Sequence, residues 1–86
     1  MSKTFNTSEE ARDIIIDLRK QLHRLPYNPD LHKLCNNIGQ MNGELSRLEV
    51  EMRQTRKSYK FDAYKLEMVE AIKRLEHLIL MAKLMA

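Results

Sequence analysis

Two rows of apolar residues, spaced three and four positions apart, run through most of the chain after residue 30. This spacing is typical of a helix that buries one stripe against a partner helix. Each row keeps its phase from beginning to end, so each predicts one helix. The first row consists of Leu31, Leu34, Ile38, Met41, Leu45, Leu48, Met52, Thr55 and Tyr59, and the second of Phe61, Tyr64, Met68, Ala71, Leu75, Leu78, Ala82 and Met85.

The two rows are out of phase with each other. If the first row continued, its buried stripe would contain the charged residues Asp62, Lys73 and Glu76. The apolar face must therefore be reset between the rows, and a reversal of the chain is the simplest way to do so. One continuous helix whose apolar face changes sides is the alternative. We favour the reversal because its two arms match in length: Asp30 to Arg53 and Lys60 to Ala86 would each be about 36–40 Å long as helices.

The first part of the chain predicts a shorter helix behind a brief lead-in. Residues 1–6 are expected to be disordered, and residues 7–86 to form a single helical domain. Thr7 and Glu10 have the spacing of a capping box, in which each side chain satisfies a backbone N–H at the helix start. Apolar positions then recur at helical spacing until Pro26 ends the pattern. We therefore expect helices at about 8–25, 29–54 and 60–85.

The second helix has a clear start and one weak stretch. Asn28 is a good N-cap, and Pro29 suits the first helical position. Gly39 and Gly43 fall inside this helix, where each costs about 1 kcal/mol relative to alanine. A loop over 36–43 is the alternative, but the apolar row continues through it, so we favour a continuous, locally weakened helix. The two glycines are also a candidate site for close approach by another helix or a ligand.

The third helix is apolar on two sides, which predicts that it contacts two neighbours. One neighbour lies within the chain, and residues 78–86, which carry a single charge, need a second neighbour to cover them. We expect another subunit or another protein there. Methionine side chains repack easily against varied surfaces and favour such a role. The candidate protein-binding residues are Leu66, Val69, Leu80, Met81, Leu84 and Met85.

A basic and aromatic segment surrounds the expected chain reversal. Its cations would release counterions from phosphates and its rings would stack on unpaired bases, so nucleic-acid contact is a second hypothesis. The alternative, which we favour, is that Tyr59, Phe61 and Tyr64 close the end of the hairpin while the cations are solvated. The candidate nucleic-acid residues are Arg53, Arg56, Lys57, Lys60 and Lys65.

Length, charge and cysteine content narrow the class of protein. A chain of 86 residues makes one domain of marginal stability, for which self-association is a common remedy. The net charge of +3 demands no acidic partner. The single cysteine excludes an internal disulfide and favours a cytoplasmic location. No run approaches the roughly 20 apolar residues of a membrane span, and residues 1–10 lack the apolar region of a signal peptide.

No motif in the chain points to catalysis or to a cofactor. His32, Cys35 and His77 are the best metal candidates, but a structural zinc site needs four ligands and a Cys-x-x-Cys-like pair is missing. A cysteine beside an apolar row is more typical of a core thiol than of a nucleophile. Gly-rich loops, His-Glu-x-x-His motifs and paired carboxylates are also absent. We therefore expect neither an enzyme nor a metal or cofactor site.

These observations predict an all-α domain in which a short first helix packs on a long, coiled-coil-like antiparallel hairpin that forms oligomers through the third helix. The predicted function is non-catalytic protein binding, as a small adaptor, chaperone or inhibitor. The predicted partners are a second copy of the chain and another protein. Nucleic-acid binding by the basic segment is the first alternative, and small-ligand binding at an oligomer interface is the second. In size and architecture the chain resembles small helical-hairpin secretion chaperones and short phage-encoded inhibitors.

Overall fold

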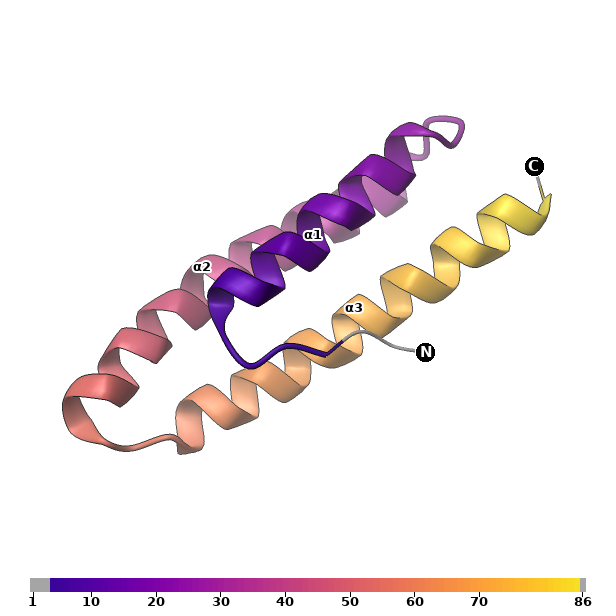
Figure 1. Cartoon of the computed structure of the whole chain (residues 1–86). Coiled ribbons are helices and arrows are strands. Elements are labelled where there is room, and N and C mark those ends of the chain that lie inside the picture. The colour runs from indigo at the N-terminus through magenta and orange to yellow at the C-terminus, as the bar shows by residue number, and fades with distance from the viewer. Residues whose placement is uncertain (1–3, 86) are drawn as a thin grey trace.

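The computed structural model describes residues 4–85, which form three α-helices and no β-strand (Figure 1). Helix α1 covers Ser8–His23, α2 covers Pro29–Thr55 and α3 covers Tyr59–Met85. Both α1 and α3 pack mainly on α2 and contact each other little. Consecutive helices run in opposite directions and lie lengthwise beside one another (Figure 1). The molecule is therefore elongated, with extents of 48 × 20 × 17 Å. The all-helical class predicted from the sequence is confirmed for the described residues.

The start of α1 is capped by side chains on both sides of the first turn. The Thr7 hydroxyl accepts a hydrogen bond from the Glu10 N–H at 3.2 Å, which confirms the predicted N-cap. The Glu10 carboxylate accepts in return from the Asn6 N–H at 3.0 Å, one residue earlier than in a standard capping box. The helix ends at His23, two residues before the expected end. Pro26 disfavours helical geometry at the residue before it, and the final turn tightens ahead of that point.

Helix α2 begins at the predicted cap and continues without a break through its weak stretch. The Asn28 side-chain oxygen accepts from the N–H groups of Asp30 and Leu31, at 3.0 and 3.4 Å, which confirms the N-cap. Gly39 and Gly43 both lie within the continuous helix, and neither has a positive φ. The loop alternative for this stretch is therefore wrong, because packing along α2 holds the weak helical residues in place.

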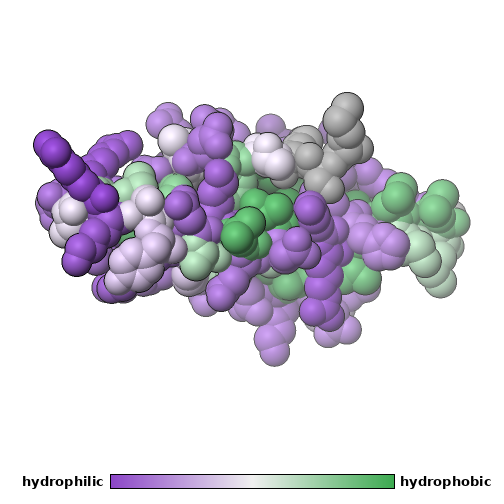
Figure 2. Space-filling view, turned by 90° about the horizontal axis from the view of Figure 1, so that it is seen from below, coloured by the Kyte–Doolittle hydropathy of each residue, from purple (hydrophilic) through white to green (hydrophobic). Residues whose placement is uncertain are grey.

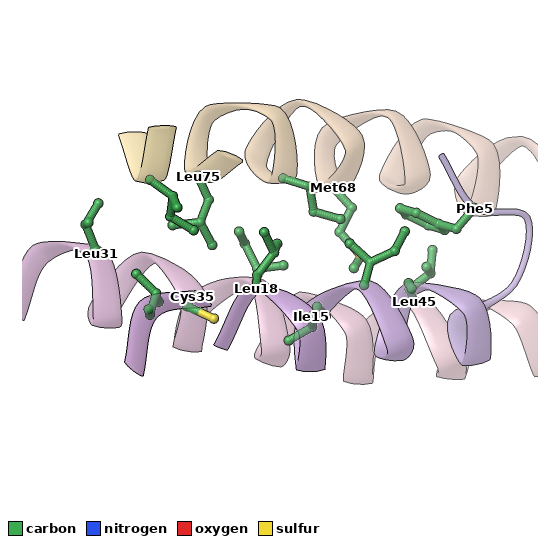
Figure 3. Close-up of a cluster of buried hydrophobic side chains, with 14 of the residues drawn as sticks. Phe5, Ile15, Leu18, Leu31, Cys35, Leu45, Met68 and Leu75 are labelled. Atoms are coloured by element: carbon green, nitrogen blue, oxygen red, sulfur yellow. The ribbon is translucent and has the colours of Figure 1, made fainter. Parts of the chain in front are cut away.

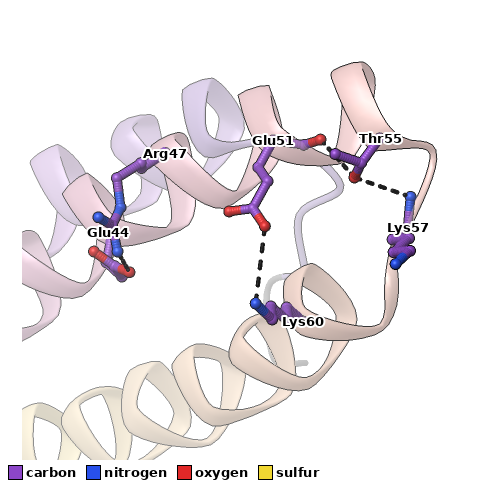
Figure 4. A network of polar contacts seen from close by, with 6 residues as sticks. All are labelled: Glu44, Arg47, Glu51, Thr55, Lys57 and Lys60. Carbon is purple, nitrogen blue, oxygen red and sulfur yellow. Dashed lines mark hydrogen bonds and ion pairs between the residues drawn. The ribbon is translucent and has the colours of Figure 1, made fainter.

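The reversal between α2 and α3 is made without glycine or proline. Arg56 caps the end of α2 in a left-handed conformation (φ 59°, ψ 19°), and its N–H donates to the Met52 carbonyl at 2.8 Å. The Thr55 hydroxyl donates to the Glu51 carbonyl at 2.9 Å and accepts from the Lys57 N–H at 3.4 Å (Figure 4). Glycine usually occupies a left-handed position at a helix end, and here the residue is arginine. The sequence therefore contains no local motif that marks this turn.

Replacing Arg56 with glycine is expected to raise the free energy of unfolding by about 0.5–1 kcal/mol. A side chain in the left-handed region costs about 1–2 kcal/mol, and the greater freedom of glycine in the unfolded chain offsets part of the gain. Urea denaturation of the two proteins measures the difference. Lys57→Gly is the matched control, since Lys57 has no positive φ to relieve and should lose stability. Equal losses in the two variants would show that the Arg56 backbone is unstrained.

The hydrophobic core lies along the length of α2, where α1 and α3 both contact it (Figure 3). Every second residue of the two apolar rows is buried along most of each row, as Leu45 and Met68 are. Helix α1 contributes further buried residues, among them Leu18. The ends of the rows differ: Tyr59 and Met85 are exposed. The core therefore fills the middle of the bundle and thins toward its two ends.

The segment before α1 contributes to the core. This differs from the prediction of a disordered lead-in over residues 1–6. Phe5 is only 1% exposed, and Figure 3 shows it between α3 and the α1–α2 pair, near Leu45 and Met68. The Lys65 ammonium also donates to the Asn6 side-chain oxygen at 3.3 Å. This segment crosses from the start of α1 to α3 and covers the side where these two helices contact each other little (Figure 1). Residues 1–3 lie outside the described part of the chain.

Candidate functional site

The candidate protein-binding surface is the face of α3 that points away from the core, which we call the outer face. Leu66, Leu80 and Leu84 lie on it and are 66%, 54% and 74% exposed. Met85, at the end of the helix, is also exposed, and Met81 is nearly half exposed. Val69 differs from the other candidates because it is half-buried and packs against the core. Five of the six predicted residues are thus available to a partner.

Polar residues divide the outer face into two apolar parts. Glu70, Lys73 and His77 are all exposed and lie between Leu66 and Leu80 along the helix. The Lys73 ammonium lies 3.8 Å from the Glu70 carboxylate. Figure 2 shows apolar surface gathered at the end of the molecule where α3 finishes, with hydrophilic side chains between it and a smaller apolar area. A partner must therefore complement charges as well as apolar side chains.

The apolar end of α3 is continuous with the connector between α1 and α2. A shallow groove of about 320 Å³ lies between them, with a mainly apolar lining. Tyr27 in the connector is exposed, and the stretch Leu25-Pro26-Tyr27 adds apolar surface beside the end of α3. The proline signal at Pro26 predicts a helix boundary but not this apolar surface. The described residues that line the groove are Leu25, Pro26, Tyr27, Asn28, Leu31, Ala82 and Met85.

The candidate close-approach pair lies on the side of α2 that faces α1. A methyl group added at Gly39 would lie 2.9 Å from the Arg19 guanidinium, which is the end of a flexible side chain, and one at Gly43 would meet nothing within 4 Å. The contact between α1 and α2 therefore does not require glycine at either position. Both residues line a shallow groove with Arg12 and Arg19 of α1.

The candidate nucleic-acid residues are spread over several places around the α2–α3 turn. Arg53 points to Glu49, with 3.6 Å between guanidinium and carboxylate, and the Lys60 ammonium lies 3.8 Å from the Glu51 carboxylate (Figure 4). Lys65 lies farther along α3 and contacts the segment before α1. Arg56 and Lys57 form the turn itself. Carboxylates thus accompany two of the five cations, and no single basic face contains them all.

The three aromatic side chains near the turn have different environments. Phe61 is buried and Tyr64 is half-buried, where desolvation raises the pKa of its hydroxyl. Tyr59 is 65% exposed, so the expectation that all three rings close the end of the bundle is wrong for this one. Tyr59 is the first residue of α3 instead of the last of the preceding row, and the new helix turns it away from the core.

The residues considered for metal or thiol chemistry do not converge. Cys35 is buried in the core, and the His32 ring packs against Tyr27 and His23 at centroid distances of 5.1 and 5.9 Å. Within residues 4–85, no group of three or more histidine, cysteine or acidic side chains is placed to hold a metal ion. None of the helices in that range has the length and apolar character needed to cross a membrane.

Comparison with known proteins supplies no family for this chain. No protein-family model, curated protein or solved structure matches it significantly.

Proposed function

We propose that this protein is a non-catalytic protein-binding module that acts through the outer face of α3, as a small adaptor, chaperone or inhibitor. The observation that supports this most directly is the exposure of Leu66, Leu80 and Leu84 on the side of α3 opposite the core. Burial of an exposed leucine is worth about 1.5–3 kcal/mol, so a partner that covers them gains substantial free energy.

The apolar end of the molecule strengthens the proposal. Met81 and Met85 are exposed beside the leucines, and the groove at the connector extends the apolar surface beyond α3. Unbranched methionine side chains adapt to partners of different shape. Large apolar side chains that cluster on a surface with charged residues at its margin are typical of protein interaction sites. No cofactor is required for this role.

The double substitution Leu80→Glu/Leu84→Glu is expected to abolish capture of a specific partner from an extract of the source cells. Two carboxylates on the binding face would have to be desolvated in the complex, and we expect affinity to fall at least about a hundredfold. Affinity capture with the tagged chain, followed by identification of the retained proteins, measures the effect.

Val50→Glu is the matched control for this experiment. Val50 is an exposed apolar residue on α2 and not on the outer face of α3, so a new carboxylate there should leave capture unchanged. Circular dichroism of both variants checks that the helices remain folded. The proposal fails if the α3 double variant retains the same proteins as the wild-type chain, or if Val50→Glu loses them equally.

A further inference from the structure

A second helical seam runs along the outer face of α3. Its positions alternate at spacings of four and three from residue 59 to residue 84, which is the heptad spacing of a coiled coil, and all eight are exposed. The seam begins with the apolar residues Tyr59, Ala63 and Leu66 and ends with Leu80 and Leu84. Its middle is polar, with Glu70, Lys73 and His77. We call these eight positions the outer seam.

The outer seam complements itself when two copies are placed antiparallel. A two-fold axis between residues 71 and 72 brings Glu70 of one copy opposite Lys73 of the second copy, and the symmetry makes this pair twice. The same register sets Leu84 opposite Tyr59 of the second copy and Leu80 opposite Ala63 of the second copy. All eight positions are matched by this one register, so no seam residue is left without an opposite neighbour.

The charges beside the seam select the same orientation. Glu67 and Arg74 flank the seam on one side and are both exposed. In the antiparallel register each lies across from the other on the second copy, which adds two further pairs of opposite charge. A parallel pair would instead set Lys73 opposite Lys73 and Glu70 opposite Glu70, and like charges at facing positions oppose association.

We propose that the occupant of the outer face is a second copy of this chain, bound antiparallel through the outer seams of the two α3 helices. This inference rests on the proposed function because it names one partner for the same surface. The apolar residues at the two ends of the seam supply the area, and the Glu70–Lys73 pairs at its centre fix register and direction.

Charge reversal at the centre of the seam tests the arrangement. Wild-type protein at about 100 µM is expected to be a dimer by light scattering. Glu70→Lys or Lys73→Glu alone should weaken self-association about tenfold or more, since both symmetric pairs become repulsive. The combined Glu70→Lys/Lys73→Glu variant, which restores opposite charges, should associate within about threefold of wild type. Asp13→Lys, an exposed charge reversal on α1, should have no effect.

Engineered cysteines test the direction of the pair. Ala63→Cys and Leu80→Cys are expected to form a disulfide with each other when the two variants are mixed and oxidised, since the antiparallel register sets these positions opposite. A rapid disulfide in Ala63→Cys protein alone would show a parallel pair and overturn the inference. So would a wild-type chain that is monomeric at about 100 µM, or a combined charge swap that fails to restore the dimer.

The results also separate this inference from the proposed function. If the wild-type chain is monomeric but Leu80→Glu/Leu84→Glu still abolishes capture of another protein, the second copy is excluded and the binding module stands. If the charge-swap pattern holds but no other protein is captured, the antiparallel dimer stands and the adaptor role falls.

Discussion

Replacing Phe5 with alanine is expected to lower the free energy of unfolding by about 3–5 kcal/mol, the usual cost of removing a fully buried phenylalanine. Phe5 is 1% exposed and belongs to the hydrophobic core. For a small domain whose total stability is about 5–10 kcal/mol, this loss is large enough to leave part of the protein unfolded at 37 °C. Because α1 and α3 contact each other little, few neighbouring side chains are available to refill the space.

Chemical denaturation at one fixed protein concentration measures the effect, since self-association would add to apparent stability. Phe5→Leu should lose less than about 1.5 kcal/mol because it keeps most of the buried volume. Tyr27→Ala is the matched control: this aromatic residue is exposed in the connector, and loss of its ring contact with His32 should cost no more than about 0.5–1.5 kcal/mol. If Phe5→Ala resembles Tyr27→Ala, the segment before α1 does not pack in solution as described.

Phe5 also shows where sequence reasoning reached its limit. Periodicity identifies a buried face only where several apolar residues recur, and Phe5 is a lone aromatic residue in a polar segment. Its burial depends on how α1 and α3 are placed relative to each other, which only the assembled helices determine. The helix starts at Thr7 and Asn28 were predictable because caps and proline act locally. The Arg56 turn was located only through the phase of the apolar rows, because its left-handed residue is not a glycine.

The candidate site was predictable in part, for a similar reason. Leu80 and Leu84 were identified correctly as lying outside the core row, since their angular position on α3 follows from helical geometry alone. Val69 is half-buried and packs against the core, since it lies at the margin between the core face and the outer face. The outer seam is not predictable from apolar periodicity, because its central positions Glu70, Lys73 and His77 are polar.

Replacing Glu49 with alanine is expected to cost about 1–3 kcal/mol of stability, as for a partly buried carboxylate that accepts charge-assisted hydrogen bonds. The spacing of Glu49 and Arg53 is that of an ordinary pair on a helix surface, worth about 0.3–0.5 kcal/mol. In the structure the Glu49 side chain is only 12% exposed, and its carboxylate accepts from the N–H and hydroxyl of Ser8 at 3.1 and 3.3 Å. Glu49 therefore holds the first turn of α1 on α2 and places a negative charge at a helix start.

Comparison of three variants decides between these two roles for Glu49. If its main partner is Ser8, Arg53→Ala should cost less than about 0.5 kcal/mol, because the Arg53 side chain is largely exposed and lies 3.6 Å from the carboxylate. Glu51→Ala removes a carboxylate two residues away that lies on the exposed surface, 3.8 Å from the Lys60 ammonium, and should be equally mild. Equal losses in Glu49→Ala and Arg53→Ala would instead identify a surface pair. A loss confined to Glu49→Ala would mean that α1 is fastened to α2 at its first turn, next to the point where Phe5 enters the core.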